Sequence, residues 1–323
     1  MADKLKRRHH TVPKFHLARF ANDRSQLARV ALPGDKRHLI SIRDATVERD
    51  FYLIEEEDGT RSDALEDLLA DSEGRAAAAV RALVDEGVWP IPDQVRWDLA
   101  GWAASQALRT TANRQSSNEV ADMMFKLAIG VGGKTKTARG LREALGREPS
   151  SAEIDREWER LNDFDGYTIK PHPNGHLNLL MTLWPGTAHM FHDRGWSVVR
   201  FKHKALVTSD NPVHLVPAPD HPEWSGVGPA TAAQIFLPLD RRVGLIMGEV
   251  GGKDMQAAPS ADLARRMNAS LAMSATAAVF HHPDDNPLVG LELPAPHQRR
   301  TGGYEQVKSL VSSERPANSP QPR

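Results

Sequence analysis

Apolar residues recur at intervals of three and four positions between Asp63 and Asp85, and this is the clearest periodicity in the chain. Such spacing places them on one face of an α-helix, which Gly87 is expected to end. The members of this stripe are Leu65, Leu68, Leu69, Ala76, Ala79, Val80 and Leu83. A second helix is predicted over residues 93–113, with Leu99, Trp102, Ala103 and Ala107 facing inward. The N-terminal half is therefore predicted to be rich in helix.

Shorter patterns predict the remaining elements. Residues 13–21 read as a short helix with Pro13 at its first position and Leu17 and Phe20 on one face. Further helices are predicted over residues 118–127, 137–145, 151–161, 177–192 and 261–274, and Pro185 should kink or split the fourth of these. After Trp196 the pattern changes to alternation. It predicts strands over residues 196–201, 205–208, 234–238, 243–248 and 277–280, besides a hairpin over residues 26–42.

These elements predict an α+β fold, in which a helix-rich N-terminal half packs on a small, mostly antiparallel sheet from the C-terminal half. We expect one globular domain over residues 5–290, with a helical subregion at 60–193 and a sheet-rich subregion at 194–290. Residues 297–323 are polar and rich in Pro and Ser, so this tail is predicted to be disordered.

Composition narrows the classes of protein. The net charge of -1 over 323 residues argues against a general nucleic-acid coat, although it allows a local basic patch. The absence of cysteine excludes disulfides, iron–sulfur clusters, thiolate zinc sites and a cysteine nucleophile. The basic N-terminus is followed by no apolar run, and no segment approaches the ~20 apolar residues that span a bilayer. We therefore expect a cytoplasmic protein with no membrane partner.

Two short motifs place polar side chains beside a proline that stiffens the backbone: His9–Pro13 near the start and Thr208–Pro212 past the middle. Other motifs accompany them in a fixed order: Phe51-Tyr52, Glu66, Glu73, Gln106 to Thr110, Gly195-Trp196 and Asn268. Together with the run from His10 to Phe20, this order resembles the bacterial family called domain of unknown function 4238, over residues 5–285. Thr11 departs from the family, which more often has an aromatic residue there. The resemblance implies a family and a fold but no activity.

Three residues are candidates for catalysis: His10, Glu73 and Asp210. His10 precedes a rigid proline, and a functional role and a buried structural role are equally consistent with the pattern. Glu66 and Glu73 are seven positions apart on the predicted helix, so they lie on nearly one face, roughly 10 Å apart. We expect Glu66 to be solvated and Glu73 to be the site candidate. Asp210 follows a short strand, a position typical of active sites, metal sites and Asx-turns alike.

Four residues are candidates for substrate binding: Gln106, Arg109, Asn211 and Tyr52. Gln106 falls on the inward stripe of its helix, where a carboxamide needs a hydrogen-bond partner. Arg109 lies one turn further on, and the two could form a fork for a carboxylate or phosphate. The alternative is that both residues simply tie this helix to Asp210 or to a backbone carbonyl.

Two further patterns are ambiguous. His189 and His192 are three positions apart, which can place two imidazoles on one helical face for a metal ion, but a surface pair fits better because no HExxH pattern is present and Pro185-Gly186 disturbs the helix. Residues 128–135 end in Gly-Lys-Thr at the spacing of a phosphate-binding loop, with Ala128 where the first glycine is usual. They follow a predicted helix rather than a strand, so we interpret them as a connector between helices.

Three functional hypotheses follow. The first is a hydrolase of a phosphodiester or related anionic substrate, a nuclease among them, in which His10 works with Glu73 and Asp210 while Arg109 holds the substrate. A divalent metal is left open as its cofactor. The second is a non-catalytic binding or regulatory module for a small anionic ligand or nucleic acid, and the third is a purely structural polar network. The first hypothesis predicts that His10, Gln106, Arg109 and Asp210 converge, with His10 and Asp210 within roughly 8 Å.

Overall fold

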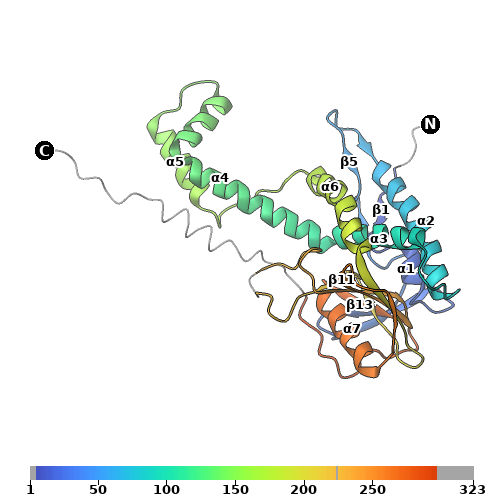
Figure 1. The fold of residues 1–323 in the computed structure, drawn as a ribbon. Coiled ribbons are helices and arrows are strands. Elements are labelled where there is room, and N and C mark those ends of the chain that lie inside the picture. The colour runs from blue at the N-terminus through green and yellow to red at the C-terminus, as the bar shows by residue number, and fades with distance from the viewer. Residues whose placement is uncertain (1–4, 223–224, 297–323) are drawn as a thin grey trace. The chain divides into compact units, whose positions relative to one another are not determined.

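The computed structural model describes residues 5–222 and 225–296, and its helices and small, mostly antiparallel sheets confirm the predicted α+β class (Figure 1). The helices are α1 (Lys14–Ala18), α2 (Ala64–Val84), α3 (Asp93–Leu108), α4 (Thr111–Leu145), α5 (Ser151–Asn162), α6 (Pro173–His192) and α7 (Ala261–Ser274). The first strands are β1 (Arg8–His10), β2 (Gln26–Ala31), β3 (Lys36–Ser41), β4 (Val47–Arg49), β5 (Ile54–Glu55) and β6 (Arg61–Ser62). The later strands are β7 (Arg194–Arg200), β8 (Thr208–Ser209), β9 (His214–Val216), β10 (Gln234–Asp240), β11 (Val243–Val250), β12 (Met255–Ala257) and β13 (Ala278–His281).

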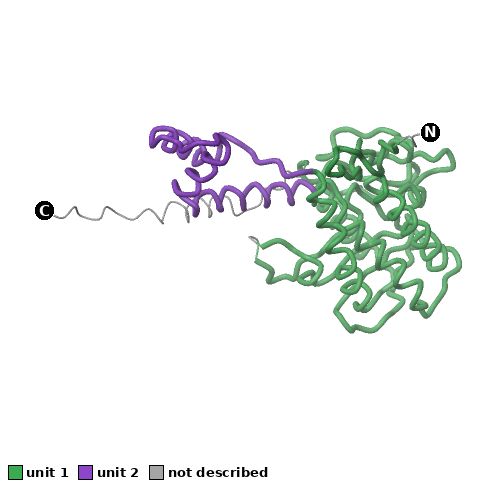
Figure 2. The backbone as a smooth tube through the Cα atoms, turned by 90° about the horizontal axis from the view of Figure 1, so that it is seen from above, with its two compact units in different colours: residues 1–113, 173–298 green, residues 114–172, 299–323 purple. Residues whose placement is uncertain are grey.

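The chain divides into two compact units, which Figure 2 shows in different colours. Unit 1 comprises residues 1–113 and 173–298, and unit 2 contains residues 114–172. The helical subregion expected at 60–193 thus contributes to both units, and the single domain expected over 5–290 stays a prediction. The tail expected to be disordered, 297–323, lies outside the described residues. None of the helices in the described part of the chain is both long and apolar enough to cross a membrane.

The core of unit 1 is built on a five-stranded sheet with the order β12-β7-β11-β10-β9. Its strands are antiparallel except that β12 runs parallel to β7. Alternate residues of a strand face opposite sides, so Trp196 and Val198 pack with α2, α3 and α6, whereas Val199 packs with α1, α7 and the second sheet. Both faces of this sheet are therefore buried.

The second sheet of unit 1 has the order β3-β2-β13-β8 and is antiparallel throughout. It joins the N-terminal hairpin to two strands from the C-terminal half, whereas every strand of the five-stranded sheet comes from the C-terminal half, as expected. The register pairs Ala28 with His281 and Thr208 with Phe280. Two-stranded ribbons, β1-β4 and β5-β6, complete the strands.

Pro185 and Gly195 are two positions in unit 1 where the residue type bears directly on the backbone. Pro185 lies inside α6, which continues as one helix to His192, so the proline does not split the helix, and the alternative expectation of a kink stays a prediction. Gly195 follows at the start of β7, where an added Cβ would lie 2.6 Å from the carbonyl carbon of Gly252. Only glycine allows this close approach of the two backbones.

Unit 2 contains most of α4 together with α5. The helices expected at 118–127 and 137–145 are parts of α4, which is interrupted only at Gly133, where φ is 59° and ψ is -168°. Lys126 is buried in this unit, and its ammonium group contacts the carboxylate of Asp122 at 2.9 Å and donates to the carbonyls of Phe164 and Tyr167. A buried cation of this kind requires such partners.

Candidate functional site

The guanidinium of Arg109 forms the centre of a polar cluster between α2 and α3. Arg109 follows α3 directly and is fully buried. Its Nη2 lies 2.7 Å from Glu73 Oε1 on α2, and its Nε and Nη2 donate to Gln106 Oε1 at 3.3 and 3.0 Å. A buried charge is costly unless it is paired and hydrogen-bonded, and these contacts supply both. Nη1 is also buried, and it has no hydrogen-bond partner among the described residues.

Gln106 connects this arginine to the N-terminal motif. Its amide nitrogen donates to the carbonyl oxygen of Thr11 at 2.8 Å, while its amide oxygen accepts from Arg109. The inward position expected for Gln106 is confirmed, because its side chain is fully buried. The contact to a backbone carbonyl matches the structural alternative for this residue, and the ligand fork stays a prediction.

Two carboxyl groups on α2 border the cluster, and their environments differ. Glu73 is held by Arg109 and its side chain is 27% exposed. Glu66, seven residues earlier, is partly buried, and burial followed by the negative charge of Glu73 raises its pKa, which Arg109 and Lys6 lower in part. The expectation that Glu66 is simply solvated is therefore wrong. The reason is that α2 turns this residue toward the same neighbours as Glu73 rather than toward solvent.

His9 and Tyr52 form the next layer of the cluster. The ring of His9 accepts from the backbone N–H of Tyr52 at Nδ1 and donates from Nε2 to the carbonyl of Lys6, so the ring is the neutral Nε2–H tautomer. Burial lowers the pKa of His9. The His9 and Tyr52 rings lie 5.3 Å apart, and Tyr52 lies close enough to Arg109 to raise the pKa of its guanidinium. Tyr52, Glu73, Gln106 and Arg109, which are far apart in the sequence, are thus brought together.

His10 lies on the other side of β1. Adjacent residues of a strand point in opposite directions, so while His9 is buried, His10 is only partly buried and contacts the carbonyl of Ile42 with Nε2 at 3.3 Å. Burial and, next, the charge of Lys14 lower the pKa of His10. The motif contains two histidines, and the alternation of side-chain direction along β1 places His9, not His10, in the cluster.

Asp210 and Asn211 stabilise the connection between α7 and β13. The Asp210 carboxylate accepts from the backbone N–H groups of Thr276, Ala277 and Ala278 at 2.8, 2.7 and 3.3 Å. Burial raises the pKa of Asp210 in spite of these bonds. The side chain of Asn211 donates to the carbonyl of Ser274 at the end of α7. These contacts are those of a turn-stabilising acid, and the catalytic role of Asp210 and the binding role of Asn211 stay predictions.

His16 on α1 joins the two sequence motifs, and the sequence analysis did not single it out. Its Nε2 lies 2.8 Å from Thr208 Oγ1, and its ring packs against Phe20 and Trp102. Complete burial lowers the pKa of His16 to about 3, so the ring is neutral at pH 7. Its position within the His10–Phe20 run was the only signal in the sequence.

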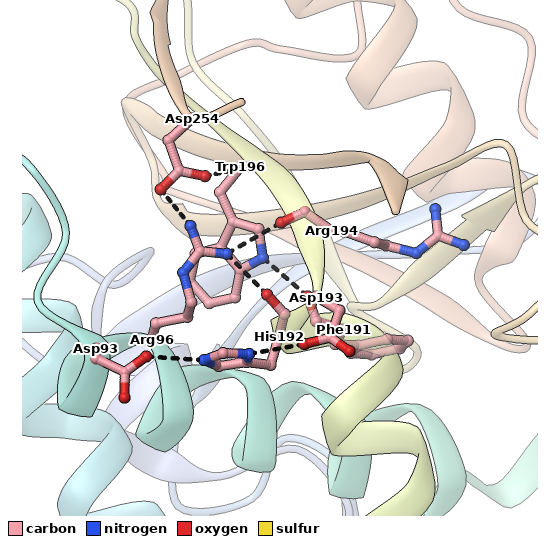
Figure 3. A network of polar contacts seen from close by, with 8 residues as sticks. All are labelled: Asp93, Arg96, Phe191, His192, Asp193, Arg194, Trp196 and Asp254. Atoms are coloured by element: carbon pink, nitrogen blue, oxygen red, sulfur yellow. Dashed lines mark hydrogen bonds and ion pairs between the residues drawn. The ribbon is translucent and has the colours of Figure 1, made fainter. Parts of the chain in front are cut away.

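The histidines expected as weak metal ligands have other partners. The ring of His192 stacks on that of Trp97, with the ring centroids 3.8 Å apart. Its two ring nitrogens contact Asp93 and Asp193, each at 3.0 Å (Figure 3). His189 contacts the carbonyl of Pro185 and the edge of Trp97. Within residues 5–222 and 225–296, no group of three or more His, Asp or Glu side chains is placed to hold a metal ion.

Beside these histidines, Arg96 clamps the junction of α3, α6 and β7 (Figure 3). Its Nη1 donates to the carbonyls of His192 and Arg194 at 2.9 and 3.0 Å, and its Nη2 pairs with Asp254. Its guanidinium also lies 4.5 Å from the centre of the Trp196 ring. This network is a structural junction that fixes how α3 meets the five-stranded sheet.

The segment that resembles a phosphate-binding loop has a helical environment. Residues 128–135 lie within α4, and Lys134 pairs with Asp155 of α5. A phosphate-binding loop needs a strand before it and backbone N–H groups free to bind the anion. The interpretation as part of a helical connection agrees with this environment.

Comparison with known proteins identifies the family. The family model described as protein of unknown function DUF4238 matches residues 8–285, so the chain belongs to this family. The match includes β1, α2, α3 and β8, and hence the Arg109 cluster. No match was found among curated proteins or among solved structures.

Proposed function

We propose that this protein is a hydrolase of an anionic ester, a phosphodiester above all, with Glu66 as the proton donor and Glu73 as the base. One observation carries the proposal: two carboxyl groups on one face of α2 have opposite environments. Glu73 is paired with buried Arg109, whereas burial and the charge of Glu73 raise the pKa of Glu66. Two acids whose environments differ in this way are the arrangement that acid–base catalysis requires.

The proposed step assigns one proton transfer to each carboxyl group. The Glu73 carboxylate accepts the proton of the attacking hydroxyl or water as its oxygen bonds to the phosphorus or carbonyl carbon. The protonated Glu66 donates its proton to the leaving oxygen as that bond breaks. The two carboxyl groups thereby exchange protonation states, and exchange with solvent restores them. Arg109 is a positioning residue here, because it is buried and holds Glu73 in place, and it does not bind the substrate itself.

The cations beside the cluster already have carboxylate partners. Lys6, Arg7 and Arg8 come immediately before the buried His9, and they pair with Asp67, Asp50 and Asp44, respectively. These pairs are at least partly exposed and exposed pairs contribute only ~0–1 kcal/mol, so an anionic group of a substrate can replace an aspartate.

The test combines activity with stability in one variant, Glu66→Gln. Hydrolysis of single-stranded RNA and of bis(4-nitrophenyl) phosphate is measured with EDTA, Mg²⁺ or Mn²⁺, because a divalent metal is left open. Glu66→Gln should abolish turnover, since glutamine has no proton to donate, and wild-type kcat should fall as pH rises through the pKa of Glu66. Exposed Glu57→Gln is the matched control and should leave turnover unchanged.

Stability supplies the independent measurement. A carboxyl group whose pKa is raised by folding contributes stability that is complete below its unfolded pKa and is lost as pH rises through its folded pKa. Glutamine copies the protonated form, so Glu66→Gln should raise the Tm at about pH 8 and leave it unchanged at about pH 3.5. An inactive variant that is more stable supports a catalytic Glu66. Full activity in this variant, or a lower Tm at pH 8, would overturn the proposal.

A binding module is the second candidate, and the buried Nη1 of Arg109 favours it. This N–H group has no partner among the described residues, so an acceptor atom of a ligand would offset its desolvation. Binding of RNA or of inorganic phosphate without turnover, lost in Arg109→Lys, would assign this function instead of the hydrolase.

A further inference from the structure

A cavity of about 540 Å³ lies away from the Arg109 cluster, at the turn between β2 and β3. Its walls come from that hairpin, from the end of β13 and from the segment that follows β13. The polar lining residues are Asp35, Arg37, His281, Asn286 and Glu292, and the apolar ones include Val30, Leu288, Leu291 and Leu293. The proposed function makes no use of any of them.

His281 gives this cavity a hydrogen-bond acceptor. The residue is 1% exposed, and its Nδ1 lies 2.8 Å from the carbonyl oxygen of His282. A carbonyl can only accept, so Nδ1 carries the proton and Nε2 carries the lone pair. Burial lowers the pKa of His281, which keeps the ring neutral at pH 7. The imidazole can therefore accept a hydrogen bond from a ligand N–H group.

The charged lining residues have opposite signs. Asp35 and Glu292 are carboxylates and Arg37 is a guanidinium, all exposed at the mouth of the cavity. Over the part of the chain that the structure describes, no ion pair joins any of these three to another side chain. They are thus available to an incoming ligand, and together they fit one that carries both a positive and a negative group.

We infer that this cavity binds a short apolar peptide through its ammonium and carboxylate groups. The peptide ammonium would contact Asp35 or Glu292, its carboxylate would contact Arg37, and an amide N–H would donate to His281 Nε2. The apolar side chains would lie against Val30 and the leucines of the lining. A ligand with only one of the two charges leaves a charged group of the cavity without a partner, and this sets the specificity.

The dipeptide leucyl-leucine is the probe, and isothermal titration with the full chain is the measurement. Leucyl-leucine should bind at millimolar concentration or below. Its N-acetyl and C-terminal amide derivatives should each bind about 1.4- to fivefold more weakly, because an exposed ion pair contributes ~0.2–1 kcal/mol. Decanoate, which is apolar but lacks the ammonium, tests whether apolar contact alone suffices. Binding of decanoate as tight as that of the dipeptide contradicts the inference.

Exposed residues provide variants that should fold normally. Arg37→Gln should weaken leucyl-leucine binding by the same factor of about 1.4 to 5, with little further loss for the amide derivative, whereas the adjacent Lys36→Gln is the control and should bind as wild type. Both variants should keep the hydrolase activity of the Arg109 cluster. No heat of binding for the dipeptide, or an unchanged Kd in Arg37→Gln, would remove the site. Neither result bears on the proposed hydrolase, since no residue is shared.

Discussion

Glu73→Gln isolates the ion pair on which the Arg109 cluster rests. The substitution keeps the shape of the side chain and one acceptor oxygen for Arg109 Nη2, which lies 2.7 Å from Glu73 Oε1, and it removes the negative charge. Removing one partner of a buried pair costs about 3–5 kcal/mol, because the other charge stays buried without compensation. Glu73 is 27% exposed, and the remaining hydrogen bond contributes about 1 kcal/mol, so we expect a loss of ~2–3 kcal/mol.

Urea denaturation at pH 7, followed by tryptophan fluorescence, measures this loss, since Trp102 and Trp196 lie in the core of unit 1. For a unit of this size, the same loss lowers Tm by roughly 4–12 °C. Glu57→Gln controls for the loss of a surface charge. In the double variant with Arg109→Met, the two effects should not add, because each substitution removes the same contact. A change below about 0.5 kcal/mol for Glu73→Gln would refute the view that this pair holds Arg109.

Three further predictions concern parts of unit 1 outside the cluster. His16 has a pKa of about 3 in the folded protein, so its contribution to the free energy of unfolding is complete above pH ~6.5 and falls as the pH is lowered toward 3. At pH 5 this loss is ~2 kcal/mol. His16→Gln should abolish this part of the acid dependence in urea titrations. Asp210→Asn should lower Tm by an amount equivalent to ~2–4 kcal/mol, since an amide cannot accept from three backbone N–H groups as a carboxylate does; an unchanged Tm would contradict that role. Arg96→Met should cost ~2–4 kcal/mol by calorimetry, because two backbone carbonyls lose a charged donor and Asp254 loses its partner; a cost near zero would show that the junction in Figure 3 does not hold α3.

The sequence predicted the features that follow from helical periodicity, namely which helices form and which of their faces are buried. The apolar stripe of α2 is confirmed except for Leu68, which is exposed, the inward face of α3 is confirmed, and Gln106 was found because it interrupts such a stripe. Strand pairing left no comparable signal. β8 has two residues and pairs with β13, about seventy positions later, so nothing local to either strand indicates the partner.

At two positions, Glu66 and His9, the sequence pattern did not predict the direction of the side chain. Glu66 and Glu73 have the same periodicity, yet the environment of Glu66 depends on residues distant in the sequence, Lys6 and Arg109, that lie near it. His9 and His10 are adjacent, and a three-residue strand gives no alternation long enough to show which histidine points inward, so the sequence did not place His9 in the cluster. Both cases concern the direction of one side chain, which tertiary contacts decide, and the catalytic role of His10 stays a prediction.

The residues joined by the hydrogen bond between His16 and Thr208 are 192 positions apart in the sequence. The separation between β2 and its partner strand β13 is larger still, since Ala28 pairs with His281. During synthesis on the ribosome, the N-terminal hairpin therefore emerges long before the strand that covers its edge. An uncovered strand edge can pair with another chain, so the nascent protein is exposed to aggregation until residue 281 has left the exit tunnel. Chaperone binding to the emerging hairpin, and insolubility of chains that stop before β13, are what this long-range pairing implies for the protein in the cell.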